Sequence, residues 1–142
     1  MSDPTKTTPL RQLKKTPTGI SGFDEITGGG LPTGRPTLVC GGPGSGKTLF
    51  GMEFLARGAR DFNEPGVFMS FEEKDTDLIE NFASLGFDLD DLMAREQIAL
   101  DYVRIERSEI LETGDFDLEG LFVRLGYAVD SIGAKRVVLD TI

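Results

Sequence analysis

The chain has 142 residues, of which 39% are hydrophobic and 27% are charged, a size and composition typical of one soluble globular domain. Its net charge is −9. It contains no histidine, and this absence excludes Ser-His-Asp and Cys-His catalysis and the commonest transition-metal ligand sets. No apolar run approaches the ~20 residues that span a bilayer, and the polar start lacks the layout of a secretory signal. We therefore expect no membrane association and a cytoplasmic location.

The first 40 residues predict an arm, a short helix and a first strand. Residues 1–18 are rich in Thr, Pro and Lys and poor in apolar residues, which indicates a flexible N-terminal arm before a domain at 19–142. A short helix is expected over 20–27, and the three glycines that follow it should end it. The apolar run at 37–40 is typical of a buried parallel strand. Its last residue, Cys40, is the only cysteine and is expected to be a small buried hydrophobe.

A glycine-rich loop follows at residues 41–48, which read Gly-Gly-Pro-Gly-Ser-Gly-Lys-Thr and satisfy every fixed position of the phosphate-binding pattern G-x-x-x-x-G-K-[ST]. Glycines let backbone N–H groups wrap a polyphosphate closely, and the following helix adds the favourable charge of its N-terminus. Lys47 is expected to reach the β- and γ-phosphates, and the Thr48 hydroxyl to ligate the Mg²⁺ that accompanies the nucleotide. The alternative is a glycine turn that enters an ordinary helix. The flanking strand and helix patterns favour a nucleoside triphosphate site.

Strands and helices are expected to alternate behind the loop. Apolar residues at three- and four-residue spacings predict a helix from residue 47 to about 60. This alternation is typical of βαβ units, so the expected fold class is α/β, with a parallel sheet covered by helices on both faces and incomplete in this chain. The remaining expected elements are a strand at 67–71, a helix at 75–85, a short helix at 88–95, a strand at 98–103, a polar loop through 115, a helix at 117–131 and a strand from 137.

Two glutamates, Glu72 and Glu73, directly follow the strand at 67–71. The carboxyl end of that strand faces the same crevice as the phosphate loop in open α/β sheets. A glutamate there can orient and deprotonate a water for attack on the γ-phosphate, and no histidine is present to do so. Alternatively, both are acids that favour the N-terminus of the next helix. Position alone does not distinguish a catalytic role from a role at the helix N-terminus. The other acids nearby, at 75, 77, 88, 90 and 91, are interpreted as caps and surface charges.

A second candidate element is the run Arg-Val-Val-Leu-Asp at 136–140, in which apolar strand residues lead to a carboxylate. Apolar runs that end in Asp are common. Because a phosphate loop lies about ninety residues upstream, the pattern predicts that Asp140 assists the Mg²⁺, directly or through water.

With these motifs in place, residues 19–142 resemble the KaiC family of RecA-like P-loop ATPases, and in particular the family's amino-terminal ATPase domain. Besides the phosphate loop, the segments that carry the resemblance are 22–26, 29–35, 64–68, 71–73, 86–89, 114–118 and 136–140. The family usually joins two such domains, the second an autokinase. This chain contains one phosphate loop, so autokinase activity is not implied.

The resemblance implies a ring, typically a hexamer, with ATP and Mg²⁺ held at subunit interfaces, and a KaiB-like regulatory partner. It also implies that Glu72 is the water-activating base and Glu73 its partner near the metal, with Lys47 counted among the catalytic residues. Thr48 and Asp140 are the implied metal residues. The implied nucleotide contacts are Gly44, Ser45, Gly46, Lys47, Thr48, Leu49 and Ser84.

We therefore expect an ATP-binding and ATP-hydrolysing subunit of a KaiC-like ring, whose nucleotide state controls conformation and partner binding in a circadian clock or in related signalling or stress regulation. One alternative is a RecA/RadA-type DNA-dependent ATPase. Residues 61–120 hold eighteen Asp or Glu against four Lys or Arg, a balance that disfavours nucleic acid. A second alternative is a non-catalytic, nucleotide-gated assembly module.

Overall fold

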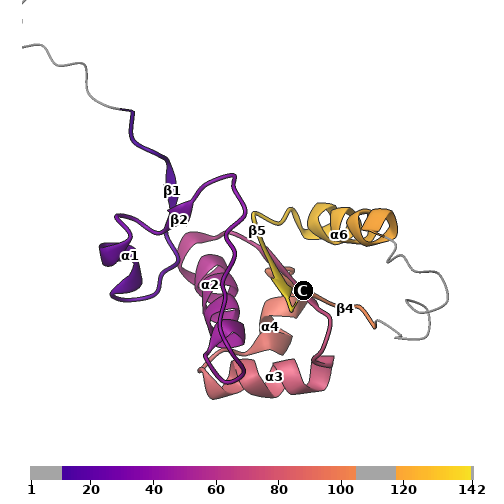
Figure 1. The fold of residues 1–142 in the computed structure, drawn as a ribbon. Coiled ribbons are helices and arrows are strands. Elements are labelled where there is room, and N and C mark those ends of the chain that lie inside the picture. The colour runs from indigo at the N-terminus through magenta and orange to yellow at the C-terminus, as the bar shows by residue number, and fades with distance from the viewer. Residues whose placement is uncertain (1–10, 105–117, 142) are drawn as a thin grey trace, which may run out of the picture.

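Three parallel strands form the main sheet, in the order β4-β3-β5 (Figure 1). This computed structural model describes residues 11–104 and 118–141. β3 (Gly66–Ser70) is the central strand, with β4 (Ile98–Tyr102) on one side and β5 (Arg136–Asp140) on the other. All five residues of β3 are buried, as is typical of a strand covered on both faces.

The three strands end at the same edge of the sheet. Ser70 lies opposite Tyr102 on one side and Asp140 on the other. Just beyond, the Phe71 N–H donates to the carbonyl oxygen of Asp140 (2.9 Å), and the Val103 N–H donates to that of Ser70 (2.8 Å). Residues that follow these strands therefore gather at one carboxyl edge, where α/β sheets bind ligands.

Helices cover both faces of the sheet (Figure 1). α2 (Lys47–Phe62), α3 (Asp75–Ser84) and α4 (Leu89–Ala94) pack on one face, and α6 (Leu118–Ile132) contacts β3 and β4 from the other. The α/β class predicted from the alternation is thus confirmed. The buried core cluster comprises Met52, Leu55, Ala56, Ala59, Phe68, Leu78, Phe82, Phe87, Leu89, Leu92 and Ile98.

Local sequence explains where these helices begin and end. α2 ends at Phe62 and is capped by Asn63, whose backbone is left-handed with φ 53°, a conformation that asparagine tolerates. α4 begins at Leu89 and is capped by Asp88, whose carboxylate accepts a hydrogen bond from the Asp91 N–H (3.0 Å). Asp75 and Asp77 occupy the first turn of α3, where negative charge is favourable. The interpretation of Asp88 as a cap is confirmed.

A small antiparallel pair precedes the main sheet. β1 (Lys15–Thr16) pairs with β2 (Leu31–Pro32), and the short helix α1 (Phe23–Ile26) lies between them. Thr18 is fully buried. Residues 15–18, which the sequence assigned to a flexible arm, are therefore part of the fold, because Lys15 and Thr16 find a strand partner that composition does not reveal.

Asp24 ties this N-terminal segment to α1. Its carboxylate accepts hydrogen bonds from the Thr18 hydroxyl (2.6 Å), the Thr18 N–H (3.0 Å) and the Gly19 N–H (2.9 Å). Burial opposes the charged form, but these hydrogen bonds, with the positive charge of Arg136, lower the pKa of Asp24 below its ordinary value. The ionised carboxylate is thus the form that holds the segment.

The expected strand at residues 37–40 does not form. Leu38 is 86% exposed, and Cys40, expected to be buried, is exposed. Within the described ranges this segment pairs with no strand, and β5 pairs with β3 alone. An apolar run becomes a strand only where a neighbour supplies ladder hydrogen bonds and cover, so this prediction was wrong.

The other predicted helices and strands are confirmed, with small shifts at their ends. Residues 1–10 of the expected arm and the expected polar loop through residue 115 lie outside the described ranges.

Candidate active site

The phosphate loop turns directly into α2. Gly44 and Gly46 have φ values of 75° and 93°, a left-handed region that glycine adopts without strain. The Ser45 N–H donates to the carbonyl oxygen of Gly42 (3.2 Å), and the Phe50 N–H donates to that of Gly46 (2.9 Å), which starts the helix. The loop therefore ends at the N-terminus of a 16-residue helix, where backbone N–H groups and the helix dipole favour an anion.

Lys47 lies against the start of the loop. A Cβ built on Gly41 would lie 3.5 Å from Lys47 Cγ and 2.9 Å from Ser45 Cβ, so a larger residue at position 41 would displace the Ser45 side chain. Lys47 is half-buried, and within the described residues its ammonium group has no hydrogen-bond or ion-pair partner. This cation is therefore available to an anion at the loop.

The structure brings Thr48 and Asp140 together from positions 92 residues apart. The Thr48 hydroxyl donates a hydrogen bond of 2.7 Å to Oδ2 of Asp140, and both side chains are partly buried. Thr48 stands in the first turn of α2 and Asp140 at the end of β5. The two residues that the sequence proposed for the metal thus share one corner at the carboxyl edge.

This pair suits Mg²⁺ in its chemistry. One hydroxyl and one carboxylate are hard oxygen ligands, and Mg²⁺ at nucleotide sites uses few protein ligands because phosphates and waters complete its shell. Among the described residues, no group of three or more His, Cys, Asp or Glu side chains could hold a metal by itself. The donor set fits an ion that arrives with a nucleotide.

The two glutamates after β3 differ in their surroundings. Glu72 is exposed, and within the described residues its carboxylate makes no hydrogen bond or ion pair. Glu73 is half-buried, and its Oε2 accepts a hydrogen bond from Asn81 Nδ2 (3.0 Å) on α3. The buried Ser70 hydroxyl donates to the Glu73 carbonyl oxygen (2.7 Å) and accepts from the Glu73 N–H (3.1 Å). Glu73 is therefore held, whereas Glu72 is free.

Ser70 and Asn81 were not singled out from the sequence. A hydroxyl at the last position of an otherwise apolar strand is a usable signal for Ser70, because a buried polar group needs partners. Asn81 carries no such signal, since its partner lies eight residues earlier, in the turn between β3 and α3.

Leu49 and Ser84 stand apart from this cluster. Leu49 follows Thr48 in the first turn of α2 and is 45% exposed. Ser84 ends α3, where its hydroxyl donates to the carbonyl oxygen of Asn81 within the same helix (2.6 Å). No hydrogen bond or ion pair in the described ranges links Ser84 to the phosphate loop, so its role as a nucleotide contact stays a prediction.

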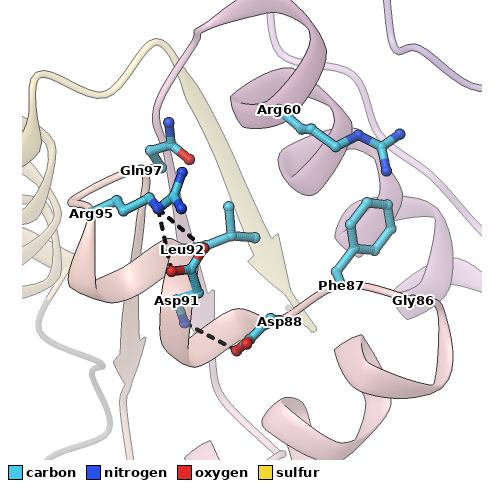
Figure 2. Close-up of a pocket in the computed structure, with 8 residues that line it drawn as sticks. All are labelled: Arg60, Gly86, Phe87, Asp88, Asp91, Leu92, Arg95 and Gln97. Atoms are coloured by element: carbon cyan, nitrogen blue, oxygen red, sulfur yellow. Dashed lines mark hydrogen bonds and ion pairs between the residues drawn. The ribbon is translucent and has the colours of Figure 1, made fainter.

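A shallow pocket lies elsewhere, between the end of α2 and the segment around α4 (Figure 2). Arg60 lies over the Phe87 ring at 5.1 Å from its centroid, and Arg95 pairs with Asp91. Arg60 also pairs with Asp61, and this hydrogen bond raises the pKa of Arg60. Carboxylates thus neutralise both cations. The lining residues are Arg60, Gly86, Phe87, Asp88, Asp91, Leu92, Arg95 and Gln97, none of them a predicted site residue.

A phosphate loop that opens a helix, beside a carboxylate at the end of a parallel strand, defines the class of P-loop nucleotide-binding domains. The profile described as "ATPase: KaiC" matches residues 16–142, so the chain belongs to the KaiC family of ATPases, with its RecA-like fold. The resemblance seen in the sequence is confirmed. No helix among the described residues is long and apolar enough to cross a membrane.

Curated relatives agree with this family. The chain is 64% identical over 130 residues to the circadian clock protein KaiC2 of Synechocystis sp., covering 92% of this chain and 23% of that protein. It is 44% identical over 133 residues to the circadian clock oscillator protein KaiC of Parathermosynechococcus lividus, covering 94% and 25%. The chain therefore spans about a quarter of the length of these relatives.

Proposed function

We propose that this chain binds and hydrolyses ATP with Mg²⁺, as a subunit of a KaiC-like ring whose nucleotide state controls conformation and partner binding. The observation that carries the proposal is the hydrogen bond between Thr48 and Asp140, because it joins the phosphate loop to the strand-end carboxylate. Membership of an ATPase family supports the same reaction.

The loop residues bind and orient the triphosphate. The N–H groups at 44–46 and the start of α2 favour the phosphate oxygens. The Lys47 ammonium, which has no partner in the described part of the chain, neutralises charge on the β- and γ-phosphates. Thr48 and Asp140 hold the Mg²⁺. When bound, that ion neutralises negative charge that develops on the transferring phosphoryl group.

Glu72 is the proposed base, which takes a proton from the water that attacks the γ-phosphate. Its support is the contrast with Glu73: the Glu72 carboxylate is exposed and has no partner among the described residues, whereas Asn81 engages the Glu73 carboxylate. The Ser70 hydroxyl binds the Glu73 backbone, and it thereby constrains the backbone of the adjacent Glu72 after the end of β3. Glu73 serves in this proposal as the held partner on the metal side.

The ring is supported by the open position of the loop. Residues 41–45 are exposed, so the residues that the structure describes leave one side of a nucleotide held here uncovered. A neighbouring subunit would complete such a site. A clock role and a KaiB-like regulatory partner are proposed from the names of the relatives, which are circadian clock proteins.

The test is ATP turnover, ATP binding and native mass of the full-length protein. We expect Glu72→Gln to keep binding and assembly and to lose turnover by at least about a hundredfold, as removal of a general base does. Lys47→Ala should lose nucleotide binding and, with it, ring assembly. Glu80→Gln and Lys135→Ala change exposed side chains outside the site and serve as matched controls. Unchanged turnover in Glu72→Gln would remove Glu72 as the base.

Two other outcomes separate the alternatives. Stimulation of turnover by single-stranded DNA, weakened by salt, would indicate a DNA-dependent ATPase. Binding of ATP with assembly but without turnover in the wild-type protein would indicate a nucleotide-gated assembly module.

A further inference from the structure

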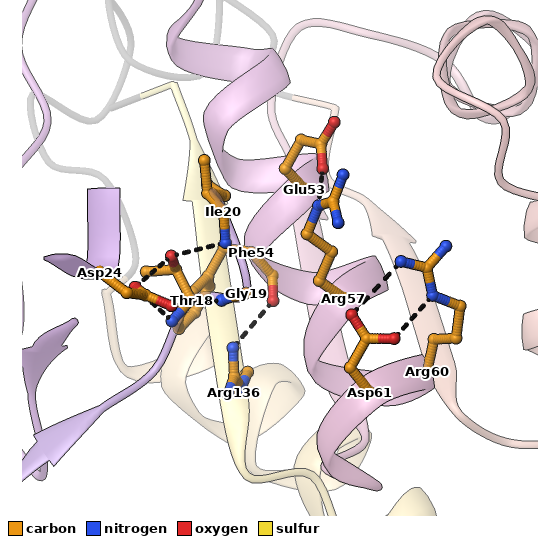
Figure 3. A network of polar contacts seen from close by, with 10 residues as sticks. All are labelled: Thr18, Gly19, Ile20, Asp24, Glu53, Phe54, Arg57, Arg60, Asp61 and Arg136. Carbon is orange, nitrogen blue, oxygen red and sulfur yellow. Dashed lines mark hydrogen bonds and ion pairs between the residues drawn. The ribbon is translucent and has the colours of Figure 1, made fainter. Parts of the chain in front are cut away.

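Arg136 is a buried cation at the first position of β5, at the end of the strand opposite Asp140. Its side chain is 1% exposed. The guanidinium donates to the carbonyl oxygen of Phe54 (3.0 Å), to that of Pro17 (2.6 Å) and to Oε1 of Glu64 (3.0 Å). Figure 3 shows Arg136 directed at the Phe54 carbonyl of α2. One side chain thus joins β5 to the helix, the N-terminal segment and the turn before β3.

α2 is shaped to receive this side chain. A Cβ built on Gly58 would lie 2.5 Å from Arg136 Cδ and 2.8 Å from Cζ, so any other residue at position 58 displaces the guanidinium. The Phe54 and Phe62 rings flank it, with Cζ 4.6 Å and 5.4 Å from their centroids. The position of Arg136 along the helix is therefore fixed on several sides.

The same face of β5 contacts α2 at three successive levels, because alternate strand residues point to one side. Arg136 meets Phe54 and Gly58, and Asp140 meets Thr48. Between them, a Cβ built on Gly51 would lie 2.9 Å from Val138 Cγ1, so the helix and strand are in close contact there too. The residues of β5 that contact α2 are thus Arg136, Val138 and Asp140.

The spacing of these contacts matches along both elements. From Thr48 to Gly58 the helix rises about 15 Å, at ~1.5 Å per residue. From Asp140 back to Arg136 the strand spans about 13 Å, at ~3.3 Å per residue. Helix and strand are thus in contact at both ends of one shared interface, with Arg136 at one end and Asp140 at the other.

We propose that Arg136, seated against Gly58, is a positioning residue for the metal site: it sets the register of β5 along α2 and thereby holds the Asp140 carboxylate at the Thr48 hydroxyl. This rests on the proposed function in taking Thr48 and Asp140 as the Mg²⁺ residues. Lysine does not substitute for Arg136, because a single ammonium cannot reproduce a planar fork that reaches three acceptors in different directions.

The experiment compares two glycine substitutions within helices of the full-length protein. Gly58→Ala introduces the clash with Arg136, whereas Gly126→Ala in α6 adds a Cβ that meets nothing within 4 Å. Arg136→Lys and Gly51→Ala are the second and third variants. At Gly51 the atoms nearest to the new Cβ belong to the Val138 and Phe68 side chains, so the contact is milder than at Gly58 and this variant reports if Gly58→Ala does not fold. Circular dichroism establishes which variants are folded.

The readout is ATP affinity by calorimetry, once with Mg²⁺ and once with EDTA. We expect Gly58→Ala and Arg136→Lys to reduce the Mg²⁺-dependent gain in affinity by about tenfold, the usual size for loss of a residue that orients a metal ligand. Gly51→Ala should reduce it less. Binding in EDTA should stay unchanged in all folded variants, and Gly126→Ala should match the wild type in both conditions.

Equal losses of ATP affinity with and without Mg²⁺ would show that Arg136 only stabilises the fold, and would overturn the proposal. An unchanged Mg²⁺-dependent gain in ATP affinity in the folded variants would overturn it too. Asp140→Asn separates this result from failure of the proposed function. If the wild type shows no Mg²⁺-dependent gain, or Asp140→Asn keeps it, the proposed metal site fails. If Asp140→Asn loses the gain and Gly58→Ala keeps it, only the positioning role fails.

Discussion

The two faces of the sheet are held in different ways. On one face, α2 buries Met52, Leu55 and Ala56 completely. On the other, α6 has no buried residue, and its Phe122 and Tyr127 are 63% and 78% exposed. Shape complementarity therefore fixes α2 on the strands, whereas α6 contacts the sheet with much of its apolar surface facing outward.

The polar contacts follow the same division. α2 is joined to β5 by Thr48 and by the buried Arg136, whereas α6 is joined to β4 by Arg124, which is half-exposed and pairs with Asp101 (2.7 Å). The candidate site belongs entirely to the tightly packed face and its carboxyl edge. Substitutions on the α2 face should therefore alter both stability and the site, and those on α6 should alter little.

The largest expected effect is on the core under α2. Leu55→Ala leaves a cavity between α2 and β3, because Leu55 is fully buried and its side chain reaches Gly66. We expect a loss of about 2–5 kcal/mol in the free energy of unfolding, measured by urea denaturation. Leu118→Ala in α6, where the leucine is 56% exposed, is the control and should cost far less. Similar losses for the two leucines would contradict the contrast between the faces.

A smaller effect is expected at Asp24, which ties the N-terminal segment beside α2. Asp24→Asn removes the charge from three hydrogen bonds and should cost about 1–2 kcal/mol at pH 7. Because folding lowers the pKa of Asp24 from its ordinary 3.8, its ionised form stabilises the fold above that pH, and the benefit is lost as pH falls through the lower folded value.

Urea unfolding at a series of pH values tests this sign. The difference between wild type and Asp24→Asn should be full near pH 7 and shrink below about pH 4. Glu25→Gln, which changes an exposed carboxylate on the same short helix, is the control. A difference that grows toward acid pH would show that the charged form of Asp24 does not hold the segment.

Features encoded locally could be predicted from the sequence. The phosphate loop at 41–48 has fixed spacing, and α2 has an apolar face that repeats with the helical period. The meeting of Thr48 and Asp140 followed from topology, because parallel strands bring their carboxyl ends to one edge.

Features that depend on distant partners could not be predicted. The run at 37–40 is as apolar as a buried strand, yet without a strand beside it in the described ranges it stays unpaired. Arg136 is the first residue of its strand, a position where the sequence alone suggests an exposed cation, and its acceptors come from three separate segments. Asn81 engages Glu73 only because α3 folds back toward the end of β3. No repeating pattern in the sequence signals any of these contacts.

A weaker effect is expected for the ion pair that joins α6 to the sheet. Arg124→Met removes the bonds to Asp101 and to the carbonyl oxygen of Tyr102 (3.1 Å) but keeps much of the apolar stem. Because Arg124 is half-exposed, we expect a loss below about 1 kcal/mol, which salt should reduce further. Unfolding in low and high salt measures it, with Arg95→Met as a control at the more exposed pair with Asp91. A salt-independent loss of several kcal/mol would show that α6 is held as firmly as α2.

The smallest effect is expected on the outer face of α6. Tyr127 is 78% exposed, so Tyr127→Ser removes little buried area and should change the free energy of unfolding by less than about 0.5 kcal/mol. ATP affinity and turnover should be unchanged, since α6 contributes no residue to the candidate site. The measurement is urea unfolding together with ATP binding, and Phe82→Ser in the core of α3 provides the opposite extreme. If Tyr127→Ser weakens the protein as much as Phe82→Ser does, the outward face of α6 contributes to stability like the core, and the contrast between the two faces fails.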